Sequence, residues 1–85
     1  MIDEDVMHEE LIAIIFRVID TMFTPKQEKT KAIFKSYIDA CINGEKWDQK
    51  KIAKEFGTVQ GYVSKIKIKY CRKLREELIR EGYVL

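Results

Sequence analysis

The chain has 85 residues, of which 46% are hydrophobic and 35% charged, and its formal net charge is +2 at pH 7. This composition excludes a disordered chain, and the length suits a single small domain, residues 1–85, with a modest core. No apolar run reaches the roughly 18 residues that a membrane-spanning helix needs, and the acidic start MIDED is the opposite of a secretory signal. We therefore expect a cytoplasmic all-α domain without a membrane partner.

The first predicted helix runs from about Glu4 to Phe23 and is apolar on more than one face. A helix of this kind has to be covered on both sides. It could be the central helix of a tight bundle. We favour the alternative of a second apolar surface that pairs with another copy of the chain or with a partner, because large exposed apolar patches are rarely left bare. The predicted interface residues are Leu11, Ile12, Ile15, Phe16, Ile19, Met22 and Phe23.

The second helix has a clear start. Thr24 can cap it, Pro25 suits its first position, and Gln27 follows the threonine by three residues. Its end is predicted near Asn43, since Gly44 just beyond can take the left-handed conformation that closes a helix.

Two cysteines, Cys41 and Cys71, lie far apart in the sequence, each within a predicted helix. Neither has another cysteine or a histidine at metal-binding spacing, and His8 is the only histidine. We predict that both thiols pack in or near the core, without a disulfide or a metal. No nucleophile with a nearby base, paired carboxylates or Gly-rich phosphate loop is recognisable, so we expect neither an enzyme nor a cofactor.

Asp48 is the predicted cap of the third helix. Trp47, just before it, can fold onto Ile52 as a hydrophobic staple. We expect this packing role for the tryptophan in preference to stacking on a nucleobase.

The segment from Gln49 to Lys69 has the pattern of two helices joined by a tight turn. Ala53 is small enough for the second helix to lie close, and Gly57 can adopt the left-handed conformation of the turn. Val63 and Ile66 then belong to the apolar wedge between the helices. The pattern is typical of a helix-turn-helix and points at DNA.

The fourth helix is predicted from Thr58 or Val59 to about Glu81, because an apolar stripe continues at spacings of three and four over this length. Tyr62 and Tyr70 lie among apolar neighbours at helical spacing. We expect both in or near the core.

Charge is distributed unevenly along the chain. Residues 1–23 contain six acids and one base, a formal charge of −5, whereas residues 46–75 contain ten bases and two acids, a formal charge of +8. The basic region coincides with the helix-turn-helix pattern. This coincidence favours nucleic-acid binding over a merely solvated helix surface.

The segment FTPKQ at residues 23–27, followed by KKIAKEFG and VSKIKIKYCRKLREEL, resembles the promoter-reading C-terminal domain of bacterial sigma factors and the small phage and plasmid regulators similar to it. The resemblance covers roughly residues 23–78. The run from Arg72 to Arg75 falls where that family also has bases along its recognition helix. The resemblance implies a four-helix domain with a C-terminal helix-turn-helix, in which the start of a long fourth helix enters the major groove of double-stranded DNA.

On this interpretation, residues at the start of the fourth helix read the bases, while lysines and arginines on the third and fourth helices contact phosphates. Gln60 suits an adenine edge, Lys65 guanine acceptors and Val59 a thymine methyl. The base-reading candidates are Val59, Gln60, Gly61, Ser64 and Lys65, and the phosphate-contacting candidates are Lys50, Lys51, Lys54, Lys67, Lys69, Arg72 and Lys73.

Two functional classes remain open, with a third more distant. The first is a transcription regulator that binds an inverted repeat as a homodimer. The second is a sigma-like interaction protein that docks on RNA polymerase or another transcription protein through its N-terminal helix. The third is a DNA-packaging or segregation adaptor, which can use a similar turn.

Overall fold

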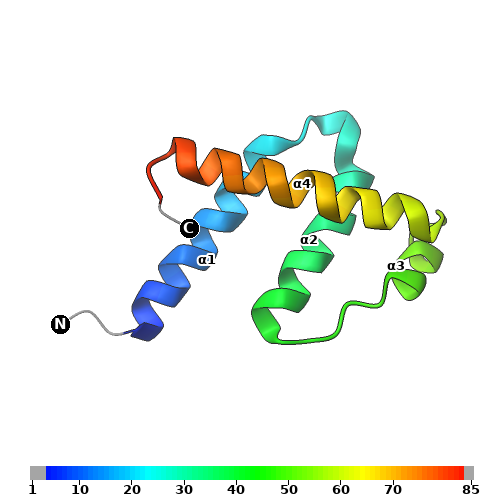
Figure 1. Cartoon of the computed structure of the whole chain (residues 1–85), viewed down its shortest axis with the longest axis horizontal. Coiled ribbons are helices and arrows are strands. Elements are labelled where there is room, and N and C mark those ends of the chain that lie inside the picture. Colours follow the sequence, from blue (N-terminus) through cyan, green and yellow to red (C-terminus); the bar gives the residue numbers. More distant parts are fainter. Residues whose placement is uncertain (1–3, 84–85) are drawn as a thin grey trace.

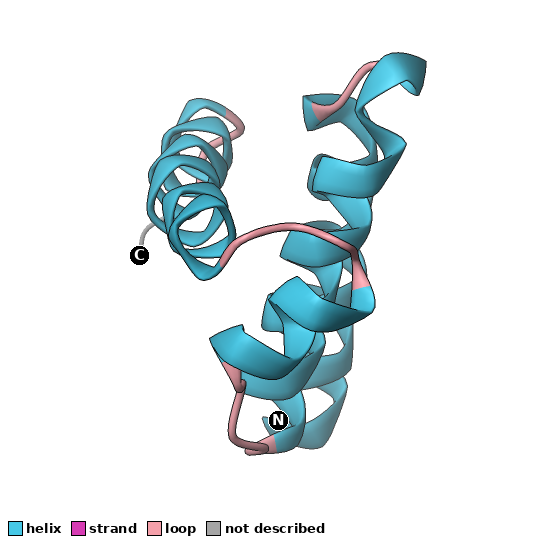
Figure 2. Cartoon of the chain, turned by 90° about the vertical axis from the view of Figure 1, so that its right-hand side faces the viewer, coloured by secondary structure: helices cyan, strands magenta, loops and turns pink. Residues whose placement is uncertain are grey.

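The computed structural model describes residues 4–83, with side chains from Glu9 onward. Its elements are α1 (Glu4–Met22), the 3₁₀ turn η1 (Pro25–Gln27), α2 (Glu28–Asn43), α3 (Gln49–Glu55) and α4 (Gln60–Arg80), shown in Figure 1. Every regular element of this part of the chain is helical (Figure 2). The prediction of an all-α domain of four helices is confirmed, although the second helix begins with η1. None of the helices in the described residues combines the length and the apolar content of a membrane-spanning segment.

The other helices are arranged around α4. It packs against α1, α2 and α3. In Figure 1, α4 crosses α2 steeply, with α1 toward its C-terminal end and α3 beside its N-terminal end. An ion pair of 3.2 Å between Arg17 of α1 and Glu81, just after α4, ties these two helices together at their exposed edge.

The helix ends form where the local sequence predicts them. The Thr24 backbone N–H donates to the side-chain carbonyl of Gln27 at 3.0 Å, which fixes the entry to η1 and α2. Gly44 takes a φ of +68° and closes α2. Asp48 accepts a hydrogen bond of 3.0 Å from the Lys50 backbone N–H, so α3 is capped as expected.

The centre of the core is made by α1, α2 and α4. Its fully buried side chains are Ile19, Ile33, Phe34 and Val63. Tyr70 is 5% exposed, which confirms its predicted place in the core. Its ring centroid lies 4.6 Å from that of Phe23 and 6.0 Å from that of Phe34. Tilted aromatic pairs at such distances add about 0.5–1.5 kcal/mol each beyond the area that they bury.

Part of the predicted interface lies inside this core. Ile19, Met22 and Phe23 are 0, 8 and 9% exposed within the single chain. The prediction of an interface is wrong for these three residues, because the C-terminal half of α1 is covered by the chain's own helices. This half of α1 matches the alternative of a central bundle helix.

Two further packing details differ from the predictions. The Trp47 indole N–H donates to the Ser36 hydroxyl at 3.1 Å, and its ring meets that of Tyr37 edge-on at 5.0 Å. Trp47 thus holds the loop between α2 and α3 against α2. The sequence predicts only its contact with Ile52 of α3. The prediction of a core thiol is wrong for Cys41, which is exposed. It follows the buried Ala40 by one residue, or about 100° of helical rotation.

A matched pair of isoleucine variants tests the core. Ile19→Val should lower the free energy of unfolding by about 0.5–1.5 kcal/mol, because it removes a methyl group from a fully buried site. Ile79→Val is the control, since Ile79 is 54% exposed, and should change stability by less than about 0.5 kcal/mol. Urea denaturation followed by circular dichroism measures both. Equal losses would contradict the burial of α1.

Candidate nucleic-acid interface

The contact between α3 and α4 is organised by one small residue and one turn. Ala53 is 4% exposed, and its carbonyl accepts a hydrogen bond of 2.9 Å from the Thr58 backbone N–H. Gly57 has a φ of +64°, in the left-handed region, as the sequence predicts. Val63 and Ile66 of α4 are 0 and 4% exposed, so they form the apolar contact that holds the second helix in place.

The first turns of α4 lie open beyond this contact. Val59 is the N-cap residue of α4 and is 69% exposed, although its side chain is apolar. Gln60, Gly61 and Lys65 are exposed as well, whereas Ser64 is half-buried. The five predicted base-reading residues therefore lie at one end of one helix, with four of them fully available to a ligand.

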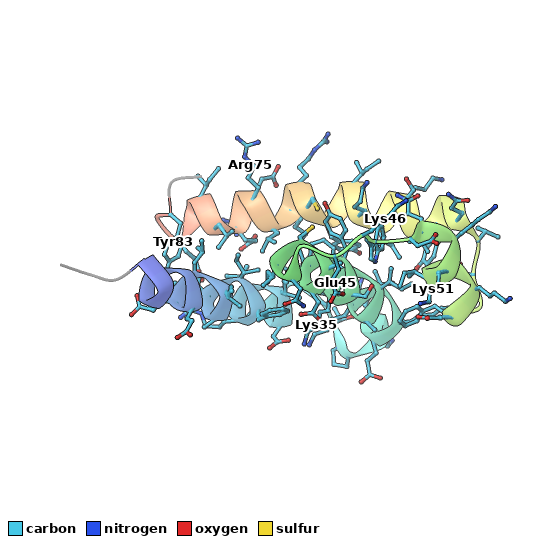
Figure 3. All side chains as sticks on the ribbon, turned by 90° about the horizontal axis from the view of Figure 1, so that it is seen from below. Lys35, Glu45, Lys46, Lys51, Arg75 and Tyr83 are labelled. Carbon is cyan, nitrogen blue, oxygen red and sulfur yellow. The ribbon has the colours of Figure 1, made fainter. Side chains whose placement is uncertain are left out.

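The bases of residues 46–75 are mostly exposed and, in the part of the chain that the structure describes, lack ion-pair partners. Nine of the ten bases are exposed and Lys67 is half-buried. Within the described residues, none of the ten takes part in a salt bridge. Arg75, which the sequence argument left out of the phosphate-contacting set, stands on the outer side of α4 in Figure 3. Its place in the basic run of α4 was the available signal.

Several bases elsewhere in the chain are paired. Asp20 of α1 accepts from Lys31 at 2.8 Å and lies 3.8 Å from Lys35. The hydrogen bond with Lys31 holds the pKa of Asp20 below its usual value. Arg80, in the last turn of α4, pairs with Glu77 at 3.2 Å. Among the described residues, the salt bridges thus involve bases of α1, α2 and the C-terminal end of α4, and none of the ten bases of residues 46–75.

Two of the predicted phosphate-contacting lysines are held against aromatic rings. The Lys67 ammonium lies 5.8 Å from the ring centroid of Tyr37, and the Lys69 ammonium lies 5.4 Å from that of Tyr70. Such cation–π contacts contribute about 0.5–1 kcal/mol at exposed sites. Lys67 is the less available of the two because it is also half-buried.

Tyr62 is a surface residue that the sequence argument placed in or near the core. It is 40% exposed, and its hydroxyl lies 3.1 Å from that of Thr30 on α2. The reason is its position on the helix: Tyr62 is one residue, or about 100°, before the buried Val63, whereas Tyr70 follows Val63 by nearly two full turns and shares its face. This spacing was the signal that could have separated the two tyrosines.

A cluster of titratable groups lies between α2 and α4. The pKa of Tyr37 is raised to about 12, mainly by a hydrogen bond with the Cys41 thiol and to a lesser extent by partial burial. Burial raises the pKa of the Cys71 thiol. These shifts favour the neutral forms of both groups, so the cluster adds no negative charge beside the basic surface.

The rest of the predicted α1 interface is only partly accessible. Leu11 is 40% exposed, while Ile12, Ile15 and Phe16 are half-buried. The apolar surface left on α1 is thus smaller than the sequence suggests.

No protein-family model, curated protein or solved structure matches the chain.

Two glycine variants test the turn. Gly57→Ala should lower the free energy of unfolding by about 1–2 kcal/mol, because an L-residue is strained at its positive φ. Gly61→Ala should instead raise it by about 0.5–1 kcal/mol, since Gly61 is helical and a Cβ there would meet no atom within 4 Å. Thermal and urea denaturation measure both changes. A stabilising Gly57→Ala variant would contradict the turn geometry.

Proposed function

We propose that the chain is a transcription regulator that binds double-stranded DNA with the first turns of α4. The observation that carries the proposal is the coincidence of two features: an open helix end, fixed by a tight α3–α4 contact, and ten bases in residues 46–75 with no salt-bridge partner among the described residues. Unpaired lysines and arginines bind DNA by releasing counterions from its phosphates. The major groove of B-form DNA is wide enough to admit an exposed α-helix.

In this proposal the start of α4 supplies sequence selectivity. Gln60 can bind an adenine edge through two hydrogen bonds, and Lys65 can reach the acceptors of guanine. The exposed Val59 side chain suits a thymine methyl group. Gly61 lacks a side chain, which allows the backbone to approach the groove closely.

Phosphate contacts fall to the bases on α3 and along α4. Lys50, Lys51 and Lys54 are exposed on α3, and Lys69, Arg72, Lys73 and Arg75 are exposed on α4. They supply affinity and salt dependence without sequence information. The resemblance of residues 23–78 to the promoter-reading domain of sigma factors supports this division of roles.

We propose further that two chains bind together on an inverted repeat. The partly exposed apolar side chains of α1, which begin with Leu11, are the proposed contact between copies. A two-fold axis is the usual symmetry of such pairs, and it would set two α4 helices about 34 Å apart on one side of the DNA. The burial of Ile19, Met22 and Phe23 leaves less apolar surface on α1 for either kind of partner. The alternative is that α1 docks on RNA polymerase or another transcription protein and that the chain binds DNA weakly or only within that assembly.

DNA selectivity is tested with duplexes selected from a random pool. The wild-type chain should enrich one sequence, and the double variant Gln60→Ala with Lys65→Ala should lose at least about 30-fold in affinity for it, because two base contacts of about 1–3 kcal/mol each are removed. Arg80→Ala is the control, since Arg80 is exposed and ion-paired at the other end of α4. It should leave affinity unchanged. Undiminished selectivity in the double variant would show that α4 does not read the bases.

The oligomeric state is tested by analytical ultracentrifugation of the free chain and of its DNA complex. We expect two chains per selected duplex, and Leu11→Glu should reduce this to one, because a charge would be placed in an apolar contact. Glu10→Gln, next to it on α1, is the control. A wild-type chain that binds the duplex as a monomer would favour the RNA polymerase alternative.

A further inference from the structure

The start of α2 and one side of α4 form a continuous surface. The Thr30 hydroxyl lies 3.1 Å from the Tyr62 hydroxyl. The Gln27 side-chain amide donates to the Tyr70 hydroxyl at 3.4 Å, and the ammonium of Lys69 lies over the same tyrosine ring. The turn η1 and the first turn of α2 are therefore held against α4, at its first turn through Tyr62 and about two turns further along through Tyr70.

Four lysines near the start of α2 divide into two pairs. Lys31 and Lys35 turn toward α1, where both meet Asp20. Lys26 and Lys29 are exposed and form no salt bridge within residues 9–83. Each of the latter comes directly before a residue that contacts α4, Gln27 in one case and Thr30 in the other.

The two sides of α4 carry separate groups of bases. In Figure 1 the start of α2 lies above α4 and α3 lies below its N-terminal end. The exposed lysines of α3 are Lys50, Lys51 and Lys54. A helix in the major groove lies between the two sugar-phosphate backbones that border the groove. Bases on both sides of α4 match this arrangement of negative charge.

We propose that Lys26 and Lys29 form a second phosphate-binding edge, which contacts the DNA backbone opposite the one bound by α3. This inference rests on the proposed function and extends it to residues that the sequence argument did not select. Tyr62 is the positioning residue, because its hydroxyl contact with Thr30 fixes the start of α2 relative to the first turn of α4. The edge supplies affinity and orientation but does not distinguish one base from another.

The salt dependence of binding measures such contacts directly. Each neutralised phosphate contributes about 0.9 to the slope of log K against log salt concentration. The double variant Lys26→Ala with Lys29→Ala should therefore reduce the magnitude of the slope by about 1.8. It should weaken binding to the selected duplex and to an unrelated duplex by the same factor, because the contacts are independent of sequence.

The matched control is Lys31→Ala with Lys35→Ala, which removes the same charge from nearby positions on α2. Its lysines face Asp20, so we expect a slope close to that of the wild-type chain. A third variant, Lys26→Arg with Lys29→Arg, preserves the charge and should restore the wild-type slope. Fluorescence anisotropy at four or more salt concentrations gives all the slopes, and circular dichroism establishes that each variant is folded.

Two outcomes would overturn the inference. An unchanged slope in the Lys26 and Lys29 alanine variant would show that these lysines do not contact phosphates. An equal reduction in the Lys31 and Lys35 variant would assign the effect to net charge alone. Failure of the proposed function is distinguishable from both, because the wild-type chain would then bind neither duplex even at low salt.

Discussion

The contact of Tyr70 with Phe23 and Phe34 is the interaction on which the remaining architecture depends. These three rings come from α4, from the residue after α1, and from α2, and they meet where the three helices converge. Because α4 is fixed there, its N-terminal half extends from a rigid point toward α3. The small Ala53 and the left-handed Gly57 then fix the other end of this half, so the direction of the helix is determined at two places.

Paired and unpaired bases lie in different parts of the molecule. Carboxylates of α1 and of the end of α4 neutralise nearby bases, as Asp20 does for Lys31. The bases of α3 and of the first turns of α4 repel one another without such relief. Surface charges of one sign lower the stability of a small domain but raise its rate of encounter with an oppositely charged polymer. Binding of a polyanion would therefore reduce the repulsion among these bases that is present in the free chain.

Local chemistry explains why much of the fold was predictable. Asp48, Gly44 and Gly57 act through their own backbone neighbourhood, so their roles can be read from a few adjacent residues. The exposed start of α4 was also predictable, since it follows from the apolar spacing around Val63.

Tertiary contacts account for the errors. Whether the apolar residues of α1 face a partner or the chain itself depends on how α4 lies over them, and Ile19 gives no local sign of the answer. The contact between Thr30 and Tyr62 joins residues 32 positions apart, so no periodicity reveals it. The same holds for the hydrogen bond between Gln27 and Tyr70, which lie 43 positions apart.

Val59 gives α4 an unusual beginning. An apolar N-cap accepts no hydrogen bond through its side chain, so the first turn has no side-chain cap, although the Tyr62 amide donates to the Val59 carbonyl at 3.1 Å. Relative to serine or aspartate, such a start costs a helix about 1 kcal/mol. We therefore expect the amides of this first turn to exchange hydrogen faster than those in the middle of α4. A ligand that binds only the ordered form of this turn spends part of its binding free energy on ordering it. The lifetime of each complex therefore depends on how many of the free amides of the turn the ligand binds.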